Sequence, residues 1–173
     1  NCSSKTRIFL RTNQEKKLFI RGYNKAPRWR SKNYKIVTSE RPGFIKALAP
    51  GKAIITTRAR KRNFVCTVIV MDMNSKKMSL KKGKSGQLKV THGGSKVKWK
   101  SSNESVVTVK KGKVKAVGTG KATVTAIAHG HAFKCRVAVP EVSVSNTSLV
   151  ASPPDGVGLI SSKSQARITV KNH

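Results

Sequence analysis

Acidic residues are scarce in this chain. Its 173 residues include six Asp and Glu against 37 Lys and Arg, which leaves a formal net charge of +31, far above the few units that most small domains carry. The carboxylates are scattered and form no pair suited to acid–base chemistry, and the sequence has no nucleophile motif and no phosphate-binding loop. The sequence therefore predicts a protein that is not an enzyme and binds no cofactor.

Long apolar runs are also missing. No stretch approaches the roughly 18 to 20 consecutive apolar residues that a membrane-spanning helix needs, and the first residues, NCSSKTRIFL, lack the apolar run of a signal peptide. No longer segment combines a helical apolar stripe with capping residues. We expect a mature or excised soluble piece that is not inserted into a membrane.

Two copies of one pattern fill most of the chain. The stretch from Ile8 aligns with the stretch from Met78 at an offset of 70 residues, which becomes 69 after a gap of one residue. A period near 70 residues is too long for a solenoid repeat and suits a small self-contained domain. We therefore predict one domain at 1–73, a second at 74–139 and a C-terminal segment at 140–173. The aligned pairs include Trp29 with Trp99, Gly51 with Gly120, Phe64 with Phe133, and Cys66 with Cys135.

Within each copy the apolar residues recur at every second position. In the second copy Phe133, Cys135 and Val137 share one phase, while Lys134 and Arg136 share the other. This period of two is typical of half-buried β-strands, and turn signals rich in Gly and Pro separate the strands. The sequence predicts an all-β chain of two tandem immunoglobulin-like β-sandwiches with a short C-terminal β segment.

The order of motifs in residues 99–139 resembles a known family. W-x-S-x-N, V-V-T-V, G-K-V-K-A, G-x-G-x-A-x-V-T-A and F-x-C-x-V-x-V follow one another as in the bacterial immunoglobulin-like group 2 (BIG2) domain. Residues 29–38 and 49–57 resemble a more divergent copy, so that the resemblance covers roughly 6–139. It implies β-sandwiches in an extracellular bacterial or phage surface protein, where such domains serve as spacers or contact carbohydrates and receptors.

Six residues are predicted to form the structural core of the two copies. Each copy has one tryptophan, which we expect to be buried as the large apolar anchor of its sandwich. Cations flank each tryptophan, and they should point away from the core because neighbours in a strand face opposite sides. The predicted core residues are Trp29, Trp99, Phe64, Phe133, Cys66 and Cys135.

The three cysteines show no metal-binding pattern, since they form no Cys-x-x-Cys pair and no Cys/His spacing. The sequence His-Gly-His at 129–131 is more typical of a hairpin turn than of a metal site. Cys66 and Cys135 take equivalent places in separate copies and cannot easily pair with each other. We expect each of them to be a buried thiol or the core end of a bridge. Cys2 is the candidate for a cross-link: it can stay free, reach Cys66 or join another chain.

The positive charge belongs to the two copies. Residues 1–139 hold 34 basic and four acidic residues, so most cations lack an intramolecular partner and their repulsion costs stability at low salt. One interpretation is a solvated surface that only confers solubility. We favour a polyanionic partner, a cell-wall polymer or a host glycan, whose binding weakens as salt is added. The candidate contacts are Arg28, Arg30, Lys98, Lys100, Arg58, Arg60, Lys61, Arg62, Lys113 and Lys115.

Two other functions stay open. RARKRN at 58–63, which we expect at a hairpin tip, is rich in cations, and NKAPRWRSKNYK at 24–35 mixes cations with stacking residues, with Tyr23 and Tyr34 as the stacking candidates. This composition fits a nucleic-acid binder. The segment 140–173 is too short to bury a sandwich core. It is a partial third domain, extra strands of the second domain, or strands that pair with another copy into a homopolymeric filament. The sequence as a whole predicts a non-enzymatic, extracellular cell-surface module for adhesion or structure.

Overall fold

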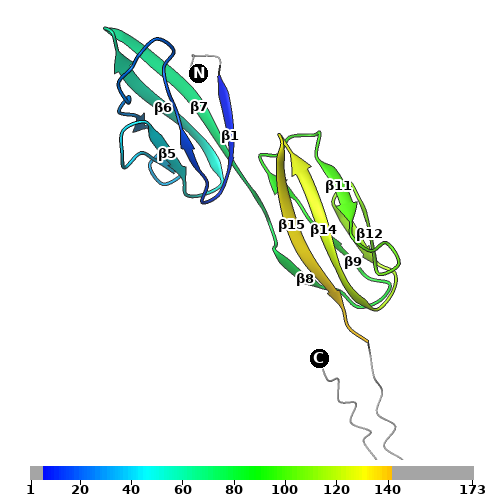
Figure 1. The fold of residues 1–173 in the computed structure, drawn as a ribbon. Helices are drawn as coiled ribbons and strands as arrows, with labels where there is room; N and C mark the ends of the chain where they lie inside the picture. The colour runs from blue at the N-terminus through cyan, green and yellow to red at the C-terminus, as the bar shows by residue number, and fades with distance from the viewer. Residues whose placement is uncertain (1–5, 142–173) are drawn as a thin grey trace, which may run out of the picture.

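Residues 6–141 are described by the structure, a computed structural model, and they form two elongated all-β bodies placed end to end (Figure 1). The all-β fold predicted from the alternating pattern is confirmed. The described residues include no helix able to span a membrane. The strands are β1 Arg7–Arg11, β2 Glu15–Lys17, β3 Arg30–Ser31, β4 Val37–Thr38, β5 Phe44–Ala47, β6 Gly51–Ala59, β7 Arg62–Met73, β8 Lys77–Ser79, β9 Ser85–Gln87, β10 Val90–Thr91, β11 Lys98–Ser101, β12 Val107–Lys110, β13 Lys113–Ala116, β14 Gly120–Ala128 and β15 His131–Val139.

The first body packs two sheets around one apolar core. Strands β1, β7, β6 and β3 form one sheet in that order, and β2, β5 and β4 form the other. Along β6 buried and exposed residues alternate, because one side of the sheet faces the core and the other faces solvent. Its largest fully buried side chains are Leu10, Val37, Ile45, Ile55, Val68 and Val70.

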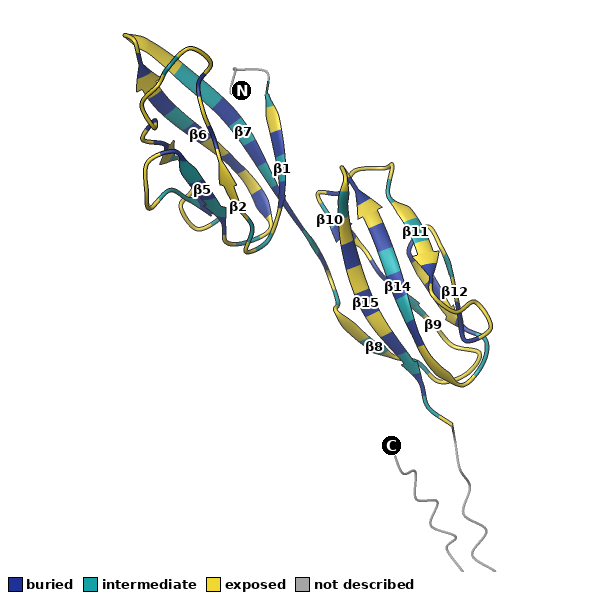
Figure 2. Cartoon of the chain, viewed as in Figure 1, coloured by how far each residue is buried: buried dark blue, intermediate teal, exposed yellow. Residues whose placement is uncertain are grey.

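The second body has the same kind of layered arrangement. Strands β11, β14, β15 and β8 form one sheet, and β12, β13 and β9 form the other. Figure 2 shows the alternation of buried and exposed residues along β15, which places its cations on the outer side of the sheet. The largest fully buried side chains here include Leu88, Val107, Val114, Val124 and Val137.

Strand β7 connects the two bodies without a loop. Most of it pairs with β1 and β6, whereas Asp72 and Met73, at its end, pair with β10 of the second body. Val70 lies in the first core and Met71 in the second, so the strand changes its buried side between these two residues. The domain limits at 73 and 139 remain predictions. Of the predicted segment 140–173, residues 142–173 lie outside the described residues.

Candidate cationic binding surface

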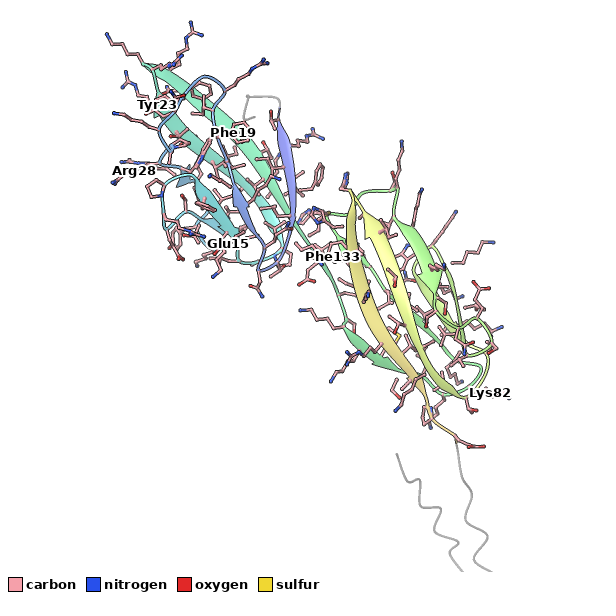
Figure 3. All side chains as sticks on the ribbon, viewed as in Figure 1. Glu15, Phe19, Tyr23, Arg28, Lys82 and Phe133 are labelled. Carbon is pink, nitrogen blue, oxygen red and sulfur yellow. The ribbon has the colours of Figure 1, made fainter. Side chains whose placement is uncertain are left out.

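A hollow of about 780 Å³ in the first body brings together three of the predicted contact residues, Arg28, Arg30 and Arg58. We call it the arginine hollow. Tyr23 and Lys25 also line it, and its lining residues include no carboxylate. Figure 3 shows Arg28 projecting from the first body. Lys25 was not singled out from the sequence, although it lies in the same basic stretch.

Trp29 determines where the two arginines beside it point. Its side chain is only 4% exposed and lies in the first core, so Arg28 and Arg30 face the opposite way. Two contacts fix the backbone here. The buried Thr57 hydroxyl donates a hydrogen bond to the Arg28 carbonyl oxygen over 2.6 Å, and Arg30 pairs with Thr56 of β6. The arginine hollow is therefore built on paired strands rather than on a free loop.

The hairpin tip between β6 and β7 carries Arg60, Lys61 and Arg62, as the sequence predicts for RARKRN. Arg60 and Lys61 have positive φ angles of 49° and 59°, and Ala59 pairs with Arg62 across the turn. A two-residue turn of this kind favours Asn and Gly, because larger side chains clash with the backbone at positive φ. The tip thus presents three cations on a strained backbone.

Replacing this turn with Asn-Gly (R60N/K61G) should raise the free energy of unfolding by about 1–2 kcal/mol, because Gly tolerates positive φ without strain. Chemical denaturation measures the change. The variant R58T/R62T removes the same charge from the flanking strands and serves as the control. An equal gain in that control would mean that relief of charge repulsion, and not of backbone strain, explains the result.

The four predicted contacts of the second body lie on two different sheets. Lys98 and Lys100 are exposed on β11, at the edge of the sheet that also contains β14 and β15. Lys113 and Lys115 are exposed on β13, in the other sheet. The structure therefore does not bring these four residues together on one surface.

Three cations of the second body were missed as candidates, namely Lys77, Lys134 and Arg136. Lys134 and Arg136 are exposed on β15, and Lys77 of β8 pairs with Arg136 in parallel register. The alternation with Phe133, Cys135 and Val137 was a sufficient signal for the two residues on β15. Lys77 had no such signal, since its position depends on the pairing of the first and last strands of the body.

Few of these cations are neutralised. Within residues 6–141 one ion pair has a nitrogen–oxygen distance below 4.0 Å. It joins Arg41 and Glu15 at 2.8 Å, and both side chains are exposed. Arg41 also lies over the Phe44 ring, 3.9 Å from its centroid. Described cations elsewhere have no carboxylate within that distance, so they are available to an external anion.

Residues 65–139 match the sequence model of the bacterial Ig-like domain (group 2) family. The chain contains a bacterial Ig-like domain of group 2. This match confirms the family recognised from the motifs in residues 99–139. Membership of the first body stays a prediction, because the match begins within β7.

Several solved structures resemble the chain at low sequence identity. Domains 4 and 5 of the S-layer protein SbsC match with 19% identity over 70% of this chain and 80% of that one, at a TM-score of 0.33. The longer rSbsC(31–844) matches with 19% identity over 72% of this chain at a TM-score of 0.33, and the chain spans 22% of its length. A C-terminal fragment of intimin, in complex with the intimin-binding domain of the translocated intimin receptor, matches with 14% identity over 75% of this chain and 52% of that one, at a TM-score of 0.38.

These structural likenesses say nothing about what the chain binds, because every TM-score is below 0.5. No curated protein matches the chain significantly. The family itself supports the coarse description, a bacterial surface module for adhesion or structure.

The predicted core residues have different degrees of burial. Trp29, Phe133, Cys66 and Cys135 are buried, at 0–5% exposure. Phe64 is partly buried against the first core, and Trp99 is partly buried against the core of the Ig-like domain. Cys66 is disulfide-bonded, and Cys135 is a free thiol. Cys2, the predicted cross-link, lies outside the described residues.

Burial raises the pKa of the Cys135 thiol above its ordinary value, and a hydrogen bond with the Ser75 side chain opposes part of this shift. Since the folded state favours the neutral thiol, this contribution to stability is complete below the ordinary thiol pKa and is lost as pH rises through the raised value. Iodoacetamide should modify Cys135 slowly in the folded chain and rapidly after unfolding, because the thiolate is the reactive form. Mass spectrometry measures both rates. Equal rates would contradict the burial of this thiol.

Proposed function

We propose that the chain is a non-enzymatic, extracellular module of a bacterial surface that binds polyanionic polymers, such as cell-wall polymers or host glycans. The observation on which this rests is the arginine hollow, where Arg28, Arg30 and Arg58 converge and the lining residues include no carboxylate. An arrangement that served only solubility would have no need to gather cations around one concave place.

The chemistry of the arginine hollow suits oxyanions. A guanidinium group offers a planar fork of donors that matches sulfate, phosphate or carboxylate oxygens, and such charge-assisted hydrogen bonds are about twice as strong as neutral ones. Thr56 and Asn63 add uncharged polar groups to the lining. Because all three arginines are exposed, they can reach an anion without the cost of burying a charge.

Binding of dextran sulfate to the full chain tests this proposal, with uncharged dextran as the reference polymer. The triple variant R28A/R30A/R58A should bind dextran sulfate about 10- to 100-fold more weakly, if each lost contact contributes about 0.5–1 kcal/mol. The control K81A/K82A/K84A removes the same charge from exposed residues that line neither cationic hollow, one of which, Lys82, lies at the far end of the second body (Figure 3). Equal losses in the two variants would refute the arginine hollow as the binding site.

The two alternative functions are tested by different measurements. A filament subunit depends on residues 140–173, and light scattering at low and high salt shows whether the chain forms large polymers. A nucleic-acid binder is favoured by Tyr23, which lines the arginine hollow, and by Tyr34, which is 71% exposed, because both rings could stack on a base. If the chain binds a short oligothymidine more tightly than dextran sulfate of similar charge, the nucleic-acid alternative replaces our proposal.

A further inference from the structure

A second cationic hollow, of about 720 Å³, lies where the two bodies meet. We call it the junction groove and define it by Arg11, Lys77, Ser102, Thr123, Lys134 and Arg136. A neighbouring hollow of about 670 Å³ shares four of these residues, namely Lys77, Ser102, Thr123 and Arg136. The two hollows are therefore continuous along the outer side of the sheet that contains β14, β15 and β8. An extended ligand would find a track here rather than an isolated pocket.

The strand register sets the spacing of cations along this track. Arg136 pairs with Thr123 on one side and with Lys77 on the other, so their side chains lie on the same outer face. Lys134, two residues before Arg136, pairs with Thr125 in the next row. Neighbouring side chains are about 5 Å apart across strands and about 7 Å apart along one strand. The track thus repeats a positive charge at intervals that suit a linear polymer with an anionic group on each unit.

The first body contributes Arg11 to the junction groove. This residue ends β1, and its Nη1 donates a hydrogen bond to the carbonyl oxygen of Ala132 in the second body over 3.4 Å. Nearby, His131 Nε2 lies 3.0 Å from the Phe9 carbonyl oxygen, and the His129 ring stacks on the Phe9 ring at 3.6 Å. These contacts, together with the continuous strand β7, place a cation of the first body beside those of the second.

A single carboxylate lines the junction groove, and it already has a partner. Asp72 Oδ1 accepts a hydrogen bond from the Met73 backbone N–H over 2.8 Å. The cations that line the same groove outnumber this carboxylate by five to one. They are Arg11, Lys76, Lys77, Lys134 and Arg136. The junction groove therefore keeps an excess of positive charge.

Hydroxyl groups among the lining residues, and the burial of their one aromatic ring, narrow the ligand class. Ser102 Oγ accepts a hydrogen bond from the Thr123 backbone N–H over 2.8 Å, which leaves its own O–H able to donate to a ligand. Phe133, the aromatic residue among the lining, is only 5% exposed, so the residues that line the groove offer a base no ring on which to stack. Cations mixed with hydroxyls suit the oxyanions and hydroxyls of a polyol or sugar chain better than a nucleic acid.

We propose that the junction groove binds a linear glycan or polyol polymer that carries phosphate or sulfate esters. The polymer runs along the outer face of β15 and contacts Arg11, so that one ligand spans both bodies. This inference rests on the proposed polyanion binding and adds to it a second site, with a narrower ligand class, that contains none of the contact residues predicted from the sequence.

Two polymers test the ligand class on the full chain. Dextran sulfate supplies sulfate esters, poly(glycerol phosphate) supplies phosphate esters, and a short oligothymidine represents nucleic acid. The variant K77A/K134A/R136A should bind the preferred ester polymer about 10- to 100-fold more weakly. For this variant the slope of log affinity against log salt concentration should become shallower by about one for each cation removed. The control K81A/K82A/K84A should keep the affinity and the salt slope of the unmodified chain. If K77A/K134A/R136A weakens oligothymidine binding more than binding of either ester polymer, the proposed ligand class is wrong.

Lysine protection gives a test that needs no substitution. Acetylation of the full chain with and without the ester polymer should show Lys77 and Lys134 protected and Lys82 unprotected, by mass spectrometry. One outcome separates the two proposals: the polymer binds and R28A/R30A/R58A weakens that binding, but the groove lysines are not protected. In that case the proposed function stands and the proposal for the junction groove is wrong. If neither ester polymer binds even at low salt, both proposals fail.

Discussion

Raising the salt concentration from about 50 to about 200 mM is expected to weaken dextran sulfate binding on the order of 10³-fold. The arginine hollow and the junction groove are lined by exposed cations, none of them in an ion pair within the described residues. Six of these cations are proposed as the main contacts, namely Arg28, Arg30, Arg58, Lys77, Lys134 and Arg136. Each contact with a polyanion releases bound counterions, so log affinity falls linearly with log salt in proportion to the number of contacts. A titration at several salt concentrations measures this slope.

Loss of the fold does not account for such a result, because added salt screens the repulsion among the cations and should stabilise the chain. The melting temperature at each salt concentration provides the control, and it should rise or stay constant. A binding affinity that hardly changes over this range would show that apolar or uncharged contacts dominate and that the excess of lysine and arginine serves solubility.

Truncating Trp29 to alanine should lower the free energy of unfolding by about 3–5 kcal/mol. The side chain is 4% exposed and lies among Val37, Ile45 and Ile55 of the first core, so its removal costs both transfer free energy and a cavity. Denaturant titration measures the loss. Because the backbone beside Trp29 carries Arg28 and Arg30, the same variant should also weaken polyanion binding.

The variant W29F serves as the matched comparison. The buried indole N–H of Trp29 has no hydrogen-bond partner within the described residues, so phenylalanine keeps most of the apolar contact and gives up no hydrogen bond. We expect W29F to cost less than half as much as W29A. A loss below about 1 kcal/mol for W29A would show that Trp29 is not the anchor of the first core.

Much of the fold follows from local pattern. The alternation of Phe133, Cys135 and Val137 with Lys134 and Arg136 predicts both the strand and the side that faces solvent, and β15 has this arrangement. The sequence RARKRN likewise predicts a hairpin tip, because Ala59 is its one apolar residue. The turn falls at Arg60 and Lys61, between the paired residues Ala59 and Arg62.

The site depends on information that local pattern does not contain. Lys113 and Lys115 share their alternation with Lys98 and Lys100, yet the two pairs belong to different sheets, which only the strand order reveals. The junction groove needs the parallel pairing of Lys77 with Arg136, residues far apart in sequence. It also needs the continuous strand β7, which places Arg11 of the first body against the second.

The central claim is that the charge acts at two defined places and not as a diffuse coat. The most direct measurement compares the dextran sulfate affinity of two variants with equal charge. One lacks the cations of both sites, through R28A, R30A, R58A, K77A, K134A and R136A, and the other lacks six exposed lysines elsewhere, through K16A, K35A, K81A, K82A, K84A and K110A. We predict a loss of about 100-fold or more in the first variant and of less than about tenfold in the second. Equal losses in both variants would contradict the claim.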